Sequence, residues 1–290
     1  MELGIHFIDF LPGDAEKLGS ALADAAKAAE EGGATMFTLA DHYFQMETMG
    51  RAQDPFLECY ASLGFLAGQT ETITLTPLVT GVTYRYPGVL AKVATTLDVL
   101  SRGRSMFGIG AAWYEREHVG LGIPYPPVRE RFEMLEETIQ ICQQMWSDND
   151  GPYEGKHYRL AETICEPQPI RRPPVLIGGG GEKKTLRLVA QYADVWNSTA
   201  LTVDELEHKI DVLNEHCAAV GRDPSTIRKT AGGLFRDPFE NLDDYLRTVE
   251  SFADLGIDLI NVGPLPGNPD PVGFVRRLCD ELLPRVTPIG

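Results

Sequence analysis

The chain has 290 residues, 43% of them hydrophobic, and a formal net charge of -16. This length suits a single α/β barrel, for which about 250 residues are typical. The acidic residues are spread along the sequence, which argues against nucleic acid and anionic membranes as partners.

Two further classes of protein do not fit the sequence. No stretch approaches the roughly 18 uninterrupted apolar residues of a membrane-spanning helix. The opening residues Met1 to Gly4 lack the basic region and cleavage pattern of a secretory signal. We therefore expect a cytoplasmic protein.

Short apolar runs alternate with segments of helical periodicity along the whole chain. The first helix has a typical pair of boundary signals, because Asp14 precedes it and Gly32-Gly33 follows it. The sequence predicts strands over 3–8, 34–40, 73–80, 105–109, 174–177, 194–197, 227–231 and 257–262. It predicts helices over 14–31, 54–69, 88–100, 129–146, 182–192, 203–220, 242–255 and 271–283.

Eight strands, each followed by a helix, predict one closed (β/α)8 TIM barrel over residues 1–290. An open, doubly wound sheet is the alternative. Residues 147–173 interrupt the alternation between the fourth helix and the fifth strand, and we expect an inserted excursion there with a small hairpin over 153–161. In such a barrel the chemistry sits where the strands end.

The cysteines and most histidines show no metal-binding or redox pattern. The five cysteines (Cys59, Cys142, Cys165, Cys217 and Cys279) are widely scattered, so we expect reduced, mostly buried thiols. His6, His118 and His157 stand singly. We predict no metal site.

Asp41 and His42 directly follow the second predicted strand. An imidazole can donate, accept or shuttle a proton near neutral pH, and an adjacent carboxylate can fix its tautomer. The alternative is a loop cap beside a surface histidine. The position at a strand end favours a catalytic role for His42.

The fourth predicted strand leads into small residues and then into rings and charges, from Gly108 to His118. The small residues, including Ala111, would let a flat ligand approach the backbone. Trp113 would lie beside that ligand or pack on the rim of the barrel. Glu115 and Glu117 rank below His42 as acids or bases, because glutamate in the first turn of a helix is ordinary dipole chemistry.

The fifth predicted strand is followed by four consecutive glycines, Gly178, Gly179, Gly180 and Gly181, which lead into a helix. Free backbone N–H groups at the start of a helix bind anions such as phosphate. The run is neither a Walker loop nor the dinucleotide spacing, and a plain turn is the alternative. Arg85, between two tyrosines, is a candidate ligand for an anionic substrate or a stacking partner for its neighbours.

Several of these segments together resemble the luciferase-like monooxygenase superfamily, and most closely its branch of oxidoreductases that use coenzyme F420, a 5-deazaflavin. The matching segments are 40–43, 80–87, 97–104, 108–113 with 117–118, 177–181 and 192–194. The resemblance implies a TIM-like barrel, a flavin or deazaflavin lying across the strand ends, and a homodimer.

The resemblance also implies roles for individual residues. Asp41 and His42 would flank the redox ring, and Leu78-Val79 would carry a non-proline cis peptide behind it. Thr80, Gly81, Ala111 and Trp113 would line the ring, and Gly178 to Gly181 would hold the phosphate. Trp113 stands where the sugar-phosphate dehydrogenases of this family carry a glutamate acid, so the glucose-6-phosphate reaction is not expected.

The sequence thus predicts an F420-dependent oxidoreductase that transfers a hydride between C5 of the deazaflavin and a small organic substrate. The alternatives are an FMN-dependent monooxygenase and a non-catalytic flavin-binding barrel. The loops over 43–54, 119–128 and 232–240 would select the substrate, but their residues do not name a compound.

Overall fold

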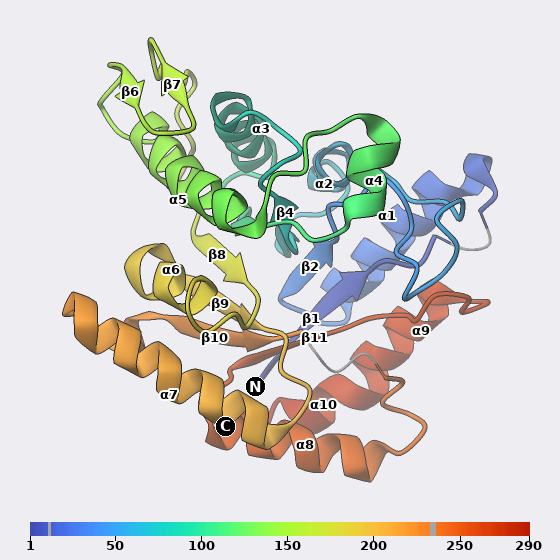
Figure 1. Cartoon of the computed structure of the whole chain (residues 1–290). Helices are drawn as coiled ribbons and strands as arrows, with labels where there is room; N and C mark the ends of the chain where they lie inside the picture. The colour runs from blue at the N-terminus through green and yellow to red at the C-terminus, as the bar shows by residue number, and fades with distance from the viewer. Residues whose placement is uncertain (11–12, 233–235) are drawn as a thin grey trace.

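Short apolar segments form the strands of the protein, whose computed structural model describes residues 1–10, 13–232 and 236–290 (Figure 1). The parallel strands are β1 (Glu2–Phe7), β2 (Met36–Leu39), β3 (Thr74–Pro77), β4 (Thr80–Gly81), β5 (Phe107–Gly110), β8 (Val175–Gly178), β9 (Val195–Ser198), β10 (Arg228–Ala231) and β11 (Leu259–Val262). Residues 233–235 of the loop expected to select substrate lie outside the described residues.

These strands form a parallel barrel with eight positions, in the order β3-β2-β1-β11-β10-β9-β8-β5-β4. β3 and β4 are two halves of one position, separated by Leu78 and Val79. A bridge between Leu75 and Ser105 joins β3 to the segment before β5 and so closes the barrel. The predicted TIM-barrel fold is confirmed.

The helices surround the barrel, with α5 and α6 on one side and α8 to α10 on another (Figure 1). They are α1 (Ala15–Glu31), α2 (Cys59–Ala67), α3 (Pro87–Leu100), α4 (Glu115–Leu121), α5 (Val128–Met145), α6 (Thr185–Tyr192), α7 (Val203–Val220), α8 (Leu242–Asp254), α9 (Pro271–Arg277) and α10 (Leu283–Val286). The strands β6 (Tyr153–Glu154) and β7 (Arg159–Leu160) form the predicted hairpin excursion.

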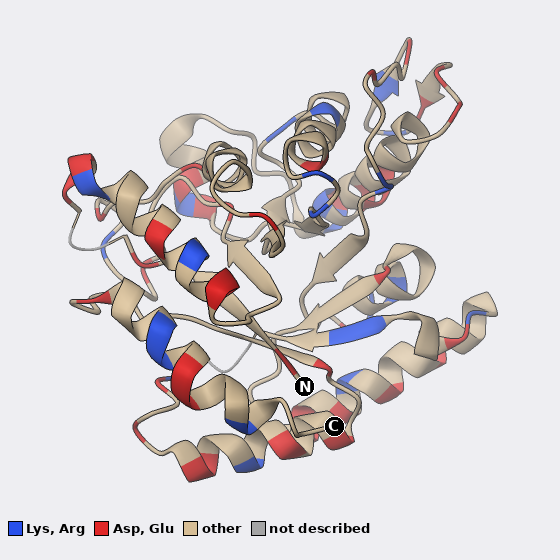
Figure 2. Cartoon of the chain, turned by 180° about the vertical axis from the view of Figure 1, so that it is seen from behind, with Lys and Arg blue, Asp and Glu red and all other residues tan. Residues whose placement is uncertain are grey.

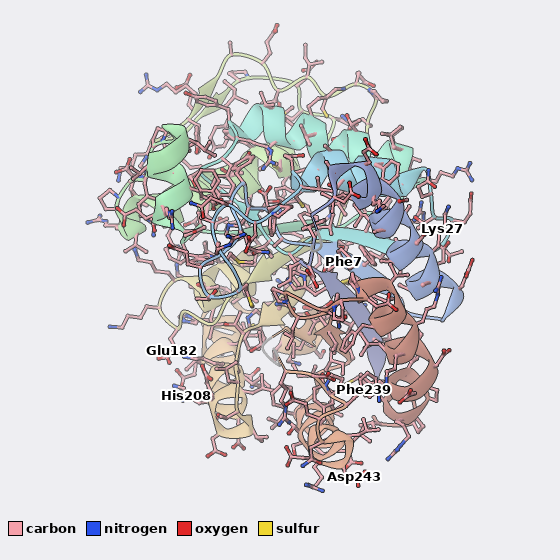
Figure 3. All side chains as sticks on the ribbon, turned by 90° about the vertical axis from the view of Figure 1, so that its right-hand side faces the viewer. Phe7, Lys27, Glu182, His208, Phe239 and Asp243 are labelled. Carbon is pink, nitrogen blue, oxygen red and sulfur yellow. The ribbon has the colours of Figure 1, made fainter. Side chains whose placement is uncertain are left out.

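The amphipathic pattern of the helices separates the core from the charged surface. Phe7 on β1 lies inside the molecule, whereas Lys27 lies on the outer side of α1 (Figure 3). Aspartate and glutamate residues are scattered along the outer helices (Figure 2). The five cysteines are buried free thiols, as predicted.

Two predicted boundaries, those of the third strand and the second helix, are wrong. The strand predicted over 73–80 is broken at Leu78-Val79, whose peptide bond is cis, as the resemblance implied. The second helix begins at Cys59, not at Asp54. Asp54 instead accepts hydrogen bonds from the backbone N–H and the side chain of Arg51, and Glu58 caps the helix by accepting from the Ala61 N–H.

Two further helices differ from the prediction at their ends. Residues 182–184 form a turn, so α6 begins at Thr185 rather than at Glu182. The last predicted helix is divided into α9, a π-helical turn over Leu278–Leu282, and α10. Helical periodicity predicts the buried face in both cases, but it does not specify the hydrogen-bonding register at helix ends.

One glycine is required where two barrel strands touch. A Cβ atom on Gly108 of β5 would lie 1.9 Å from the carbonyl oxygen of Pro77, directly before the break between β3 and β4. That oxygen belongs to the backbone, so the clash cannot be relieved by a side-chain rotation.

We expect Gly108→Ala to lower the free energy of unfolding by about 1–3 kcal/mol or more. Gly19→Ala is the matched control, because Gly19 lies within α1 with open space around it. There an alanine should raise stability by about 0.5–1 kcal/mol. Urea unfolding of both variants checks this, and equal effects would contradict the steric argument.

Candidate functional site

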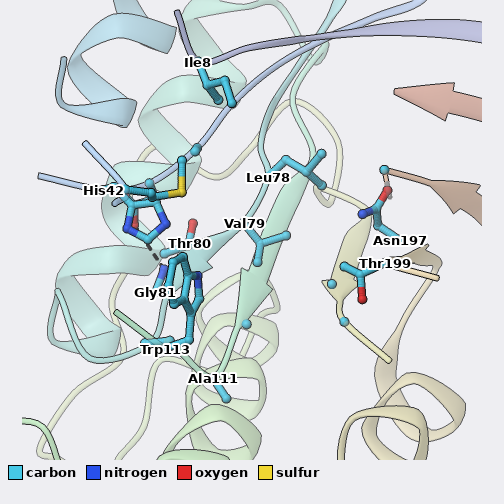
Figure 4. Close-up of a pocket in the computed structure, with 18 of the residues that line it drawn as sticks. Ile8, His42, Leu78, Val79, Thr80, Gly81, Ala111, Trp113, Asn197 and Thr199 are labelled. Carbon is cyan, nitrogen blue, oxygen red and sulfur yellow. Dashed lines mark hydrogen bonds between the residues drawn. The ribbon is translucent and has the colours of Figure 1, made fainter. Parts of the chain in front are cut away.

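A cavity of about 410 Å³ lies at the carboxyl ends of the barrel strands (Figure 4). Its walls come from the carboxyl ends of β1, β2, β3, β4, β5, β8, β9 and β10 and the segments that follow them. The lining residues are His6, Ile8, Ala40, Asp41, His42, Met46, Thr48, Met49, Leu78, Val79, Thr80, Gly81, Tyr84, Gly110, Ala111, Ala112, Trp113, Gly178, Gly179, Thr185, Asn197, Thr199 and Gly232.

Most of the site residues predicted from the sequence meet in this cavity. Those that line it are Asp41, His42, Leu78, Val79, Thr80, Gly81, Ala111, Trp113, Gly178 and Gly179. Three others do not belong to its lining. Gly180 is half-buried and Gly181 is exposed beyond Gly179, and Arg85 lies behind the wall.

The floor of the cavity is the side chain of Val79, which lies between two glycines. A Cβ atom on Gly110 would lie 2.8 Å from Val79 Cγ2, and one on Gly178 would lie 2.9 Å from Val79 Cγ1. Glycine at both positions therefore leaves room for Val79 and keeps the floor low. The result is a shelf of backbone and one aliphatic side chain, on which a flat molecule can lie.

His42 is held at one edge of this shelf by a carboxylate. Its Nδ1 lies 2.7 Å from Glu117 Oε1, and the ring packs edge-on against Trp113 at 5.4 Å between centroids. The carboxylate accepts the Nδ1 proton, which leaves Nε2 as the ring nitrogen available to a ligand. Only 8% of the His42 surface is exposed.

Glu117 is fully buried and accepts hydrogen bonds from two different loops. The N–H groups of Tyr43 and Phe44 donate to Oε2 at 2.8 and 3.2 Å, and the Tyr84 hydroxyl donates to Oε1. Burial raises the pKa of the Glu117 carboxyl, but the hydrogen bonds from His42, Tyr84 and Tyr43 outweigh burial and lower it below its usual value. The carboxylate is therefore ionised at neutral pH.

This arrangement corrects two expectations. Glu117, ranked as ordinary helix-dipole chemistry, is the group that orients His42. Asp41 was expected to be the carboxylate that orients His42. It instead accepts hydrogen bonds from both Nη atoms of Arg85, at 2.8 and 3.0 Å, and from the N–H of Gly81 at 3.2 Å. Burial raises the pKa of Asp41, and the Arg85 guanidinium opposes that rise.

The Arg85 side chain is bound by other residues of the protein. Besides Asp41, its guanidinium donates to Glu58 and lies 4.8 Å from the centre of the Tyr60 ring. The guanidinium therefore fixes the loop after β4 against α2. The structure therefore gives no support to the expected contact between Arg85 and an anionic substrate.

The wall beyond His42 is apolar. Ile8, Ala40, Met46 and Tyr114 form a small buried cluster, with Met49 packed on it. Trp113 is 54% exposed and stacks on Tyr114 at 5.3 Å, so it stands at the mouth of the cavity. Figure 4 shows His42 and Trp113 on the opposite side of Val79 from Asn197 and Thr199.

Asn197 presents a fixed amide to the other side of the cavity. Its Oδ1 accepts from the Thr230 hydroxyl at 2.9 Å and from Asn261 Nδ2 at 3.3 Å. Because both donors meet the oxygen, Nδ2 is the atom left for a ligand. A bound group at this end would therefore offer an acceptor, such as a hydroxyl or phosphoryl oxygen.

The glycine run, residues 178–181, extends from the Asn197 end of the cavity towards solvent. Its turn is tied to α7, because Lys209 Nζ donates to Glu182 Oε1 at 2.5 Å and His216 binds the Glu182 carbonyl oxygen at 2.8 Å. Glu182 also lies next to His208 (Figure 3). Across the described chain, the N–H groups of Gly180 and Gly181 have no hydrogen-bond acceptor.

His6 lies at the base of the cavity in a neutral state. Its Nδ1 lies 2.8 Å from Thr38 Oγ1. Burial, with a smaller contribution from the charge of His42, lowers its pKa to about 4. His6 therefore adds no positive charge to the site at neutral pH.

Residues 1–10, 13–232 and 236–290 contain no cluster of three or more potential metal-ligating side chains. Within the same ranges, no helix is long and apolar enough to span a bilayer.

The sequence interpretation missed several residues of the site. Asn197 is the last residue of a predicted strand and Thr199 lies two residues beyond it, so their position was a usable signal. Met46 and Met49 lie in a loop without periodicity, and Thr185 was placed inside a helix. Nothing local marks Glu117 as a partner of His42, because 75 residues separate them.

Comparisons with known proteins agree with this architecture. The sequence profile described as luciferase-like monooxygenase matches residues 1–236. An uncharacterized protein of Mycobacterium tuberculosis (strain ATCC 25618 / H37Rv) is 32% identical over 228 residues, which cover 78% of this chain and 76% of that protein. The F420-dependent glucose-6-phosphate dehydrogenase of Microbacterium testaceum (strain StLB037) is 32% identical over 205 residues, which cover 69% of this chain and 59% of that enzyme.

Two solved structures share the fold over nearly the whole chain. The coenzyme F420-dependent tetrahydromethanopterin reductase of Methanopyrus kandleri has a TM-score of 0.79 at 17% identity, covering 98% of this chain and 99% of its own. The oxygenating constituent of 3,6-diketocamphane monooxygenase of Pseudomonas putida, in complex with FMN, has a TM-score of 0.71 at 16% identity and covers 99% of both chains. At these identities the likeness concerns the fold alone. Because the sequence profile covers most of its length, the chain belongs to the luciferase-like monooxygenase family.

Proposed function

We propose that this protein is an oxidoreductase that binds coenzyme F420 and supports hydride transfer between the deazaflavin and a small organic substrate. The observation that carries the proposal is the flat shelf over Val79, with His42 at one edge and the donors of Asn197 and the glycine run at the other. The names of the relative from Microbacterium testaceum and of the reductase from Methanopyrus kandleri support F420 as the cofactor.

The residues present fit such a cofactor by shape and by donor chemistry. A Cβ atom at Gly110 or Gly178 would collide with Val79, so the sequence preserves the low floor that a tricyclic ring needs. Neutral donors suited to a phosphate gather at the far end, namely the N–H groups of Gly180 and Gly181 and the hydroxyls of Thr185 and Thr199. Bound there, the deazaflavin would supply a two-electron hydride donor or acceptor.

The protein's own part in the chemistry would be carried by His42. Glu117 accepts the Nδ1 proton, so Nε2 faces the cavity and can bind, orient or protonate an oxygen of the substrate. Tyr84 and two backbone N–H groups keep the Glu117 carboxylate ionised and stationary. Trp113 and the apolar wall limit the access of water to that nitrogen.

The principal alternative is an FMN-dependent monooxygenase, because the structural relative from Pseudomonas putida contains FMN. Both ring systems are flat and carry a phosphate on the side chain, so one shelf suits both.

We expect saturable quenching of F420 fluorescence on titration with the purified protein, and weaker binding of FMN. Tight FMN binding without F420 binding would favour the monooxygenase, and binding of neither would contradict both assignments.

The role of His42 can be tested separately from cofactor binding. We expect His42→Ala to lower turnover by about 10²- to 10⁴-fold, the usual contribution of a general acid or base, with little change in F420 affinity. Glu117→Gln should act in the same direction but less strongly, because the imidazole remains in place. Turnover assays with F420 titration on each variant check both effects.

Glu115→Gln is the matched control, because Glu115 lies on the same first turn of α4 and is exposed. It should retain the turnover of the unmodified protein. Full activity in His42→Ala would refute the role of the imidazole. Loss of F420 binding together with activity in Glu117→Gln would point to a structural role for that carboxylate.

We further propose that the protein is a cytoplasmic homodimer, as the family resemblance implies. Size-exclusion chromatography with light scattering should give twice the chain mass of 31.9 kDa. A monomeric mass at micromolar concentration would contradict this assembly.

A further inference from the structure

The cavity wall on the His42 side is almost free of charge. Ile8, Met46, Met49 and Trp113 supply its surface, and Met46 is nearly fully buried in the apolar cluster behind it. Unbranched thioether side chains adapt their shape to apolar ligands of different outline. This wall therefore favours contact with hydrocarbon rather than with ions.

Cations near this wall are neutralised by the protein itself. Among the described residues that line the cavity, none is lysine or arginine. Three of the arginines around the cavity each bind a carboxylate: Arg51 binds Asp54, Arg85 binds Asp41, and Arg116 binds Glu47. A fourth, the buried Arg131, donates to the carbonyl oxygens of Ala111 and Pro126. None of them is left to receive an anionic substrate.

The carboxylates at the site would also repel an anionic substrate. Asp41 forms part of the cavity wall, and Glu117 lies directly behind His42 with its charge buried. An anionic substrate group placed beside His42 would lose its hydration without gaining a counter-ion, which is a costly exchange. A neutral carbonyl or hydroxyl would lose far less and could still bind Nε2 of His42.

We infer that the substrate is a neutral, largely apolar molecule with one polar group that binds His42, and that sugar phosphates and carboxylates are excluded. This inference rests on the proposed function, because that function assigns the apolar side of the cavity to the substrate. It also separates this chain from its relative in Microbacterium testaceum, whose name specifies glucose 6-phosphate.

Binding of matched probes tests the inference without requiring turnover. Isothermal titration of the F420-saturated protein would compare neutral ketones (cyclohexanone, 2-octanone and acetophenone) with keto acids of similar shape, such as phenylglyoxylate for acetophenone. At least one neutral probe should bind, and at least about tenfold more tightly than its anionic partner. Equal or tighter binding of the anion, or no binding of any neutral probe, would overturn the inference.

A charge placed in the wall should change this selectivity. Met49→Lys adds a cation to the cavity lining, so it should reduce the preference for the neutral probe by about tenfold. Val220→Lys is the matched control, because it adds the same charge at the exposed end of α7, outside the cavity lining. It should leave the preference unchanged, and an equal effect of both variants would contradict a role for the wall.

Different results would contradict the proposed function and the inference about substrate. If the protein binds no F420 but its cavity still prefers neutral probes, the proposed function fails and the character of the wall stands. If F420 binds and the anionic probe is preferred, the cofactor assignment stands and the inference about substrate is wrong. Titrating F420 before the probes therefore separates the two results.

Discussion

The site depends on one buried carboxylate. Glu117 has no exposed surface, and four donors reach it: the ring of His42, the hydroxyl of Tyr84, and the N–H groups of Tyr43 and Phe44. A buried charge is tolerated only when it is well hydrogen-bonded. The same four bonds that stabilise the charge join the loops after β2 and β4 to α4, so the orientation of His42 is fixed by the requirement to satisfy Glu117.

A second constraint is steric and lies at the centre of the barrel. Val79 fills the space above β5 and β8 only because Gly110 and Gly178 have no side chains. The walls then rise on two sides with different chemistry. One side is apolar and carries the imidazole, and the other carries the amide of Asn197 and the exposed N–H groups of the glycine run. A ligand with a flat ring and a phosphate tail matches this division in a way that a compact ligand does not.

Charge is arranged behind the cavity rather than in it. Arg85 binds Asp41 and Glu58 at the back of the wall, and this ion pair positions Gly81 through the bond from its N–H to Asp41. In a chain with a net charge of -16, Arg51, Arg85 and Arg116 are each bound to a carboxylate near the His42 side of the cavity. The cavity therefore combines neutral hydrogen-bond donors at one end with an apolar wall at the other.

The sequence by itself determined the barrel and the ring of strand ends, because both follow from local signals. Apolar runs, caps and turns repeat eight times. Asp41-His42 and Gly178-Gly179 directly follow predicted strands, and the segment 78–81 lies at the end of another. Those segments could be predicted to converge because parallel barrel strands end at one rim. Only the tertiary structure decided which carboxylate serves which partner. Asp41 is next to His42 in sequence but binds Arg85, whereas Glu117, 75 residues away, binds His42. Neighbours along an extended loop point in different directions, so pairing of charges is set by the packing of distant segments and has no local signature.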